Sequence, residues 1–132
     1  MQHQSTYRVY YEDTDAGGVV YYANYLKFAE RARTEMLRDL DIHQSALAEE
    51  RNILFVVRKA MLDLQRPARL DDLLSITTTV EKVGAATLEI RQELQSDEQN
   101  IARIDVTIAT IDQDFKPKKI PADIRQLFMH TE

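Results

Sequence analysis

The clearest pattern in the chain is a helical repeat of apolar positions in its first third. Apolar side chains recur at three- and four-residue intervals, and charged residues such as Arg31 and Glu35 fall on other faces. The apolar positions are Tyr22, Tyr25, Leu26, Ala29, Met36, Leu37 and Leu40. This spacing predicts one long amphipathic helix over residues 24–40, with Asn24 as its N-cap.

Elsewhere, apolar positions alternate with polar ones, which is the repeat of a half-buried strand. This alternation predicts strands over residues 54–65, 74–81, 88–94 and 103–108, and an earlier strand over residues 7–12. Turn-forming residues at 66–69, 83–85 and 97–100 separate the later strands. Short helices are expected over residues 45–50 and 121–129.

The order of these elements is one strand, one long helix and then four consecutive strands. A helix with one apolar face can pack on an antiparallel sheet so that each buries the apolar face of the other, which is an α+β architecture. We therefore expect a single domain over residues 1–132, with an antiparallel sheet of about five strands wrapped around one central helix. The open edges of such a sheet favour self-association.

Composition and charge narrow the class of protein. A formal net charge of −5 argues against a general nucleic-acid binder, although residues 51–70 are locally basic. The chain has no cysteine, the N-terminus lacks a signal-peptide pattern, and the longest aliphatic and aromatic run, residues 53–57, is too short to span a bilayer. We expect a cytoplasmic protein that does not span the membrane.

Metal and cofactor chemistry has no support in the sequence. The three histidines are scattered, without carboxylates at ligand spacing. Gly17-Gly18 is an isolated pair rather than a phosphate-binding loop, and no Gly-x-Ser-x-Gly motif is present. We predict no metal site and no cofactor.

The segment over residues 11–25 carries the candidate chemistry. Three acids, Glu12, Asp13 and Asp15, precede two glycines and the start of the predicted helix. A helix N-terminus offers unpaired N–H groups and a partial positive charge that polarise a carbonyl, and a nearby carboxylate can activate water or attack directly. The same run is also an ordinary turn, in which Glu12 and Asp13 are turn or surface acids. The residues alone leave both readings open.

A family resemblance favours the catalytic reading. Residues 11–21, Tyr-Glu-Asp-Thr-Asp-Ala-Gly-Gly-Val-Val-Tyr, followed by residues 23–25 and 30–37, closely resemble the Tol-Pal-cluster acyl-CoA thioesterases. These belong to the 4-hydroxybenzoyl-CoA thioesterase branch of the hotdog-fold proteins. The resemblance continues into residues 57–59 and 67–72 and so covers most of the chain.

The resemblance implies a hotdog fold, an acyl-CoA substrate and a set of site residues. Asp15 corresponds to the catalytic carboxylate, as nucleophile or general base, and the backbone N–H near Tyr22 to the group that holds the thioester oxygen. Close relatives often have His where this chain has Tyr22, which leaves substrate choice open. The remaining expected substrate-binding residues are Gly17, Gly18, Val19 and Asn24 around the motif. Candidates for the CoA phosphates are Arg58 and Lys59, with Arg66 and Arg69 further along the same basic stretch.

Partners and alternative functions follow from the same resemblance. Hotdog thioesterases pair through their sheets as dimers or tetramers, with sites at subunit interfaces. One alternative is an aryl thioesterase acting on hydroxybenzoyl-CoA or dihydroxynaphthoyl-CoA. Another is a non-catalytic module that binds acyl groups or acyl carrier protein beside the enzymes of phospholipid synthesis.

Overall fold

The computed structural model describes residues 1–129. Its elements follow the expected order of strand, long helix and four strands. They are β1 (Gln2–Arg8), the 3-10 helix η1 (Tyr11–Asp13), α1 (Asn24–Asp39), α2 (Gln44–Arg51), β2 (Leu54–Leu64), β3 (Leu73–Val83), β4 (Thr87–Ser96), β5 (Gln99–Ile111) and α3 (Ala122–Met129). The predicted α+β class is confirmed.

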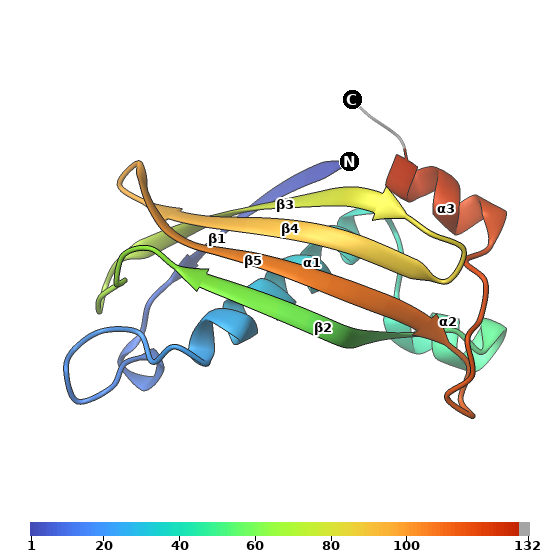
Figure 1. The fold of residues 1–132 in the computed structure, drawn as a ribbon, viewed down its shortest axis with the longest axis horizontal. Coiled ribbons are helices and arrows are strands. Elements are labelled where there is room, and N and C mark those ends of the chain that lie inside the picture. The colour runs from blue at the N-terminus through green and yellow to red at the C-terminus, as the bar shows by residue number, and fades with distance from the viewer. Residues whose placement is uncertain (130–132) are drawn as a thin grey trace.

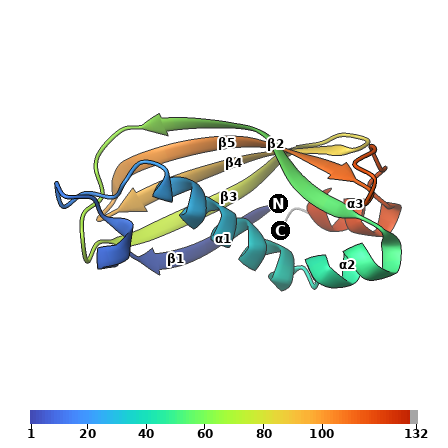
Figure 2. The ribbon, with the colours of Figure 1, turned by 90° about the horizontal axis from the view of Figure 1, so that it is seen from below.

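The strands form one antiparallel sheet in the order β1-β3-β4-β5-β2. The two strands that flank α1 in the sequence, β1 and β2, are therefore the two edges of the sheet. Helix α1 lies behind the sheet in Figure 1 and beneath it in Figure 2. The segment that joins β1 to α1 projects beyond the sheet near the C-terminal end of β2 (Figure 1).

The core lies between α1 and the face of the sheet that it covers. The helix contributes Phe28, Ala29, Ala32, Met36 and Leu37, all buried, because these residues share its apolar stripe. The sheet contributes side chains that alternate along each strand, which are Leu74, Ile76, Leu88, Ile90, Leu94, Ile104, Val106 and Ile108. Burying each large apolar side chain stabilises the fold by about 1.5–3 kcal/mol. Because α1 is held against the sheet by these buried side chains, their packing sets the position of the helix and of its first turn.

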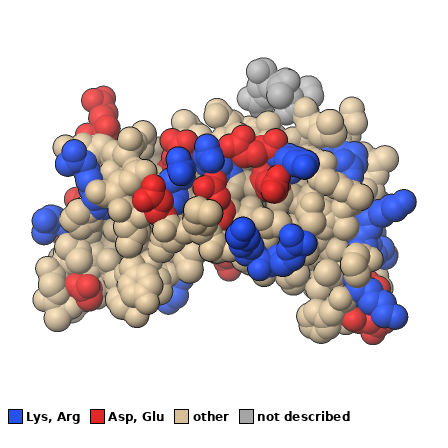
Figure 3. All heavy atoms as spheres, viewed as in Figure 1, with Lys and Arg blue, Asp and Glu red and all other residues tan. Residues whose placement is uncertain are grey.

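The face of the sheet that α1 leaves uncovered is charged. Acidic and basic side chains gather across the strands there (Figure 3). The Arg91 guanidinium lies 2.9 Å from Asp105 and 3.6 Å from Glu81, and Asp105 raises the pKa of Arg91.

None of the helices in the described part of the chain is long and apolar enough to cross a membrane.

The predicted helix over 24–40 and the last four strands are confirmed to within a few residues. The first strand was predicted wrongly, because β1 spans Gln2–Arg8 and ends before residues 9–12. Its partner β3 begins at Leu73, opposite Arg8, so the chain has no strand to pair with beyond that point. The Tyr10 N–H instead donates to the Asp13 carboxylate at 2.9 Å, which accompanies the turn of η1.

Candidate active site

Residues 13–21 form a small hairpin that carries Asp15. The Tyr21 N–H donates to the Asp13 carbonyl at 3.0 Å, Thr14 and Val20 form an antiparallel bridge, and the Asp15 N–H donates to the Val19 carbonyl at 2.9 Å. The hairpin closes at Gly18, whose N–H donates to the Asp15 carbonyl at 3.0 Å. Gly18 has φ +79°, a conformation that a residue with a Cβ adopts only under strain.

The Asp15 side chain is exposed at the neck of this hairpin. Its Oδ1 accepts the Gly17 N–H at 2.8 Å, which orients the carboxylate. Within residues 1–129, no donor is hydrogen-bonded to Oδ2. One oxygen is therefore held by the backbone, while the other is available to a reactant.

Helix α1 begins immediately after the hairpin and presents unpaired donors there. Its N-cap is Ala23, and no side chain of residues 1–129 caps the helix. The Asn24 N–H donates to the Tyr21 carbonyl at 2.8 Å, but the N–H groups of Tyr22 and Ala23 have no acceptor among the described residues. Free N–H groups at a helix N-terminus, together with its partial positive charge, can hold a carbonyl oxygen that becomes negative.

Asp15 and Tyr22 line the same hollow, which has a volume of about 420 Å³. The hairpin and the start of α1 supply one side, and the end of β2 with the loop that follows it supplies the other. The lining residues are Asp15, Val19, Val20, Tyr21, Tyr22, Tyr25, Leu64, Gln65, Arg66 and Pro67. The hollow thus places a carboxylate and a helix entrance in one cleft with largely aromatic and aliphatic walls.

The second side of the hollow is attached to the first by hydrogen bonds across the fold. The buried Tyr25 hydroxyl accepts the Ala68 N–H at 3.0 Å, and the Val20 N–H donates to the Ala68 carbonyl at 2.8 Å. Burial raises the pKa of the Tyr25 phenol above its usual 10.0. The sequence prediction missed Leu64, Gln65 and Pro67 as site residues, although Pro67 belongs to the turn noted in the family resemblance.

The Tyr22 ring is 58% exposed and packs against the Tyr21 ring with centroids 5.0 Å apart. The predicted residues Gly17 and Gly18 form the exposed tip of the hairpin, and Val19 lines the hollow. Of the residues proposed around the motif, Asn24 differs most from expectation. It is the first residue of α1 rather than its N-cap, and its side-chain amide donates to Asp13 Oδ1 at 3.3 Å.

Asp13 corrects another expectation. Instead of a surface acid, it is a buried carboxylate with 7% of its surface exposed. Its burial is compensated because both of its oxygens accept hydrogen bonds, one from the Tyr10 N–H and one from the Asn24 amide. Glu12 is exposed, as predicted.

Of the four predicted CoA-binding cations, Arg58, Lys59 and Arg69 do not line the hollow with Asp15. Arg58 is exposed at the irregularity where the pairing of β2 with β5 shifts, between Val57 and Lys59. Lys59 lines a different hollow on the charged face, beside Glu89 and Asp105. The predicted cation that shares the hollow with Asp15 is Arg66.

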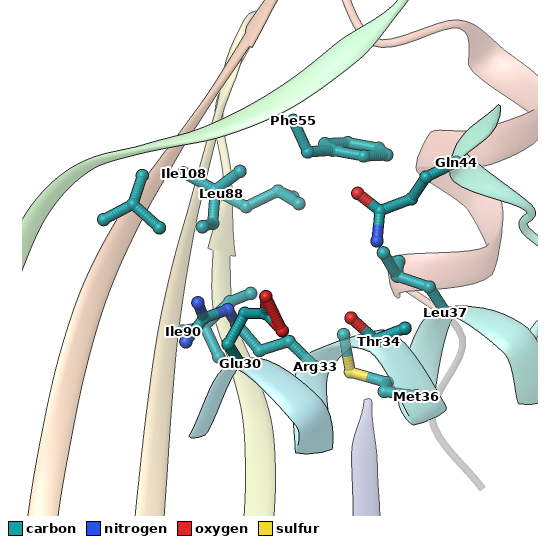
Figure 4. A pocket seen from close by; sticks show the side chains of 11 residues that line it. Glu30, Arg33, Thr34, Met36, Leu37, Gln44, Phe55, Leu88, Ile90 and Ile108 are labelled. Carbon is teal, nitrogen blue, oxygen red and sulfur yellow. The ribbon is translucent and has the colours of Figure 1, made fainter. Parts of the chain in front are cut away.

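A separate cavity of about 250 Å³ lies between α1 and the sheet, with Phe55, Leu88, Ile90 and Ile108 among its lining residues. Glu30 and Arg33 project into it from α1 (Figure 4). The Arg33 guanidinium donates to the side-chain oxygen Oε1 of the buried Gln92 at 2.9 Å, and burial lowers the pKa of Arg33. Glu30 therefore belongs to this cavity and does not line the hollow of Asp15.

Comparison with known proteins assigns the chain to a family. The sequence profile of the thioesterase-like superfamily matches residues 9–128. The chain belongs to this superfamily. It is 45% identical over 126 residues to the acyl-CoA thioesterase YbgC of Haemophilus influenzae, across 95% of this chain and 93% of the relative.

Two further relatives extend the comparison. The chain is 31% identical over 119 residues to a 1,4-dihydroxy-2-naphthoyl-CoA hydrolase of Nostoc punctiforme, across 89% of this chain and 80% of the relative. A crystal structure of a probable thioesterase from Bartonella henselae matches with a TM-score of 0.87 at 37% identity, across 92% of this chain and 100% of that one. The predicted hotdog fold and the predicted resemblance to acyl-CoA thioesterases are thereby confirmed.

Proposed function

We propose that the chain hydrolyses the thioester bond of an acyl-CoA to a free carboxylic acid and CoA. The observation that carries this proposal is the hollow in which the Asp15 carboxylate and the unpaired N–H at Tyr22 lie together. The 45% identity to a relative named as an acyl-CoA thioesterase supports it. Thioester hydrolysis needs a group that delivers oxygen to the carbonyl carbon and donors that stabilise the oxyanion.

In the proposed reaction the thioester oxygen accepts hydrogen bonds from the helix entrance at Tyr22. Asp15 then acts in one of two ways. As a nucleophile, its carboxylate attacks the carbonyl carbon, the C–S bond breaks, and water hydrolyses the resulting anhydride. As a general base, it takes a proton from the water that attacks the carbonyl carbon. In both routes the departing CoA thiolate takes up a proton. Gly17 orients the carboxylate through its N–H.

The two routes differ in where the oxygen atom of water is found. A single turnover in oxygen-18 water labels the Asp15 carboxylate only if an anhydride forms and water attacks it at the aspartyl carbon. Trapping the acyl-enzyme would identify the nucleophilic route independently. An unlabelled Asp15 together with no trapped intermediate favours the general base.

The anionic phosphates of CoA need cations near the hollow. Arg66 lines it, and Arg58 and Lys59 stay candidates that would reach CoA from outside its walls. If Arg66 contacts a phosphate, Arg66→Gln raises KM and weakens the dependence of KM on salt concentration, with kcat preserved. Arg8→Gln is a matched control outside the hollow, and an equal change in both variants contradicts this role.

We further propose that the chain is a cytoplasmic homo-oligomer, a dimer or a tetramer, with its sites at subunit interfaces. The β2 edge leaves backbone groups unpaired and exposes Val57, Met61 and Leu64, of which Leu64 also lines the hollow. Light scattering of the purified protein tests the assembly, and a monomer that turns over acyl-CoA contradicts an interface site. Acyl carrier protein and phospholipid-synthesis enzymes are candidate partners.

The deciding experiment compares wild type with Asp15→Asn on aliphatic acyl-CoAs of different lengths and on benzoyl-type CoAs. We expect wild-type turnover and at least a 100-fold loss of kcat in the variant, which is about 2.7 kcal/mol of barrier. Asp114→Asn is the matched control, because Asp114 lies in the loop after β5, at the opposite end of the sheet from the hairpin (Figure 1).

Two results would contradict the proposal. Equal activity of wild type and Asp15→Asn removes Asp15 from the chemistry. A folded wild type that binds acyl-CoA without hydrolysing any substrate identifies a non-catalytic acyl-binding module instead.

An aryl-CoA thioesterase is the second candidate. The tyrosine pair that lines the hollow, Tyr21 and Tyr22, offers flat surfaces to an aromatic acyl group. The relative from Nostoc punctiforme is named for a naphthoyl-CoA substrate. Higher kcat/KM on the benzoyl-type CoAs than on the aliphatic series would favour this candidate, and the reverse order would eliminate it.

A further inference from the structure

The hairpin of Asp15 and the entrance of α1 are joined by a partly buried hydrogen bond outside the hollow. The Asn24 side-chain amide donates to Asp13 Oδ1 at 3.3 Å. Asp13 Oδ2 accepts the Tyr10 N–H at 2.9 Å, so both carboxylate oxygens are engaged. Neither Asp13 nor Asn24 lines the hollow.

The hydrogen bond between Asp13 and Asn24 connects the two segments that carry the proposed catalytic groups. Asp13 precedes Asp15 by two residues, and Asn24 follows Tyr22 by two residues. The Asp13 carbonyl also accepts the Tyr21 N–H, so Asp13 contacts the segment beside Tyr22 through backbone and side chain. Asp15 and Tyr22 themselves share no hydrogen bond in the described structure.

We propose that Asp13 and Asn24 are positioning residues, which set the distance between the Asp15 carboxylate and the N–H groups at Tyr22. This inference rests on the proposed function. A buried carboxylate near a helix N-terminus is stabilised by the helix dipole and by its donors, so the contact holds its geometry. Asn24 uses its amide for this contact, so in this reading it acts on the substrate only through Asp15 and Tyr22.

The test is a reciprocal exchange of the two side chains. Asn24→Asp places two carboxylates against each other, and Asn24→Ala removes the donor. We expect kcat to fall about 10- to 100-fold in both, because misplacing reacting groups by about 1 Å costs about 100-fold. KM should change less than about threefold, since the walls of the hollow are intact. The double exchange D13N/N24D restores a donor and an acceptor and should recover most of the lost kcat.

Thermal unfolding separates this role from a general effect on stability. Asn52→Ala is the stability control. It removes one side-chain hydrogen bond, which Asn52 accepts from the Gln113 N–H at 2.9 Å, and it strains a backbone at φ +54°, but Asn52 lies at the end of α2. This control should lower Tm without lowering kcat, measured well below Tm. Asn24→Ala should lower kcat at the same temperature.

Three outcomes would overturn the inference: a kcat of Asn24→Ala within twofold of wild type, a loss of kcat in Asn52→Ala equal to that in Asn24→Ala, or a double exchange no more active than its worse single variant. An inactive wild type would instead overturn the proposed function, so the two failures are distinguishable.

Discussion

The two adjacent glycines of the hairpin allow the placement of Asp15 to be tested separately from the stability of the loop. Gly17 lies outside the left-handed region, and a Cβ added to it would sit 3.2 Å from Asp15 Oδ1. Gly18 has φ +79°, but a Cβ added there would meet no atom within 4 Å. Gly17→Ala therefore disturbs the carboxylate, whereas Gly18→Ala strains the backbone.

The expected loss of kcat in one variant and the expected fall in Tm in the other can be estimated from these contacts. A Cβ at 3.2 Å pushes the carboxylate by a few tenths of an ångström. Because about 1 Å of misplacement costs about 100-fold in rate, Gly17→Ala should lower kcat about three- to tenfold. In Gly18→Ala, the left-handed conformation costs about 1–2 kcal/mol. At about 3 °C per kcal/mol for a domain of this size, Tm should fall by about 3–6 °C.

The assay pairs steady-state kinetics on the best acyl-CoA with thermal unfolding of the same samples. We expect Gly17→Ala to lose kcat with Tm within about 2 °C of wild type, and Gly18→Ala to lose Tm with kcat within about twofold. The reasoning is refuted if Gly17→Ala keeps full kcat, or if Gly18→Ala loses at least as much kcat as Gly17→Ala well below its Tm.

Two further predictions concern the buried polar groups that support the site. Tyr25→Phe leaves the Ala68 N–H without its acceptor, which should cost about 1–3 kcal/mol in urea unfolding; an unchanged midpoint contradicts this. Because the folded state raises the Tyr25 pKa, it holds that proton more tightly than the unfolded chain. The resulting stabilisation is present below pH 10 and is lost as pH rises through the folded pKa, so Tyr25→Phe should destabilise less at alkaline pH. Gln92→Leu removes the partner of Arg33 and Thr78 beneath α1, so it should cost about 2–4 kcal/mol. A Gln92→Leu protein as stable as wild type would show that this buried network makes no net contribution to the free energy of unfolding.

Local pattern was sufficient for most of the fold. The helix over 24–40 and the last four strands follow from repeats of 3.6 and two residues, because each repeat places its own apolar side chains on one face. The alternation of apolar and polar positions did not predict a strand over residues 2–6. The side chains that point inward from β1 there include His3 and Ser5, which are not apolar. A polar inner face gives no hydrophobic alternation to detect.

For the candidate site, too, some features follow from the sequence and others only from the tertiary structure. By itself, the sequence determined that an acid, two glycines and a helix start follow one another, because these groups are neighbours in the chain and their roles are local. Only the tertiary structure decided that Asp13 is buried against Asn24, that Lys59 faces away on the charged side of the sheet, and that residues 64–67 complete the hollow. Those contacts depend on strand register and on hydrogen bonds between distant segments, such as Tyr25 with Ala68, which no local repeat encodes.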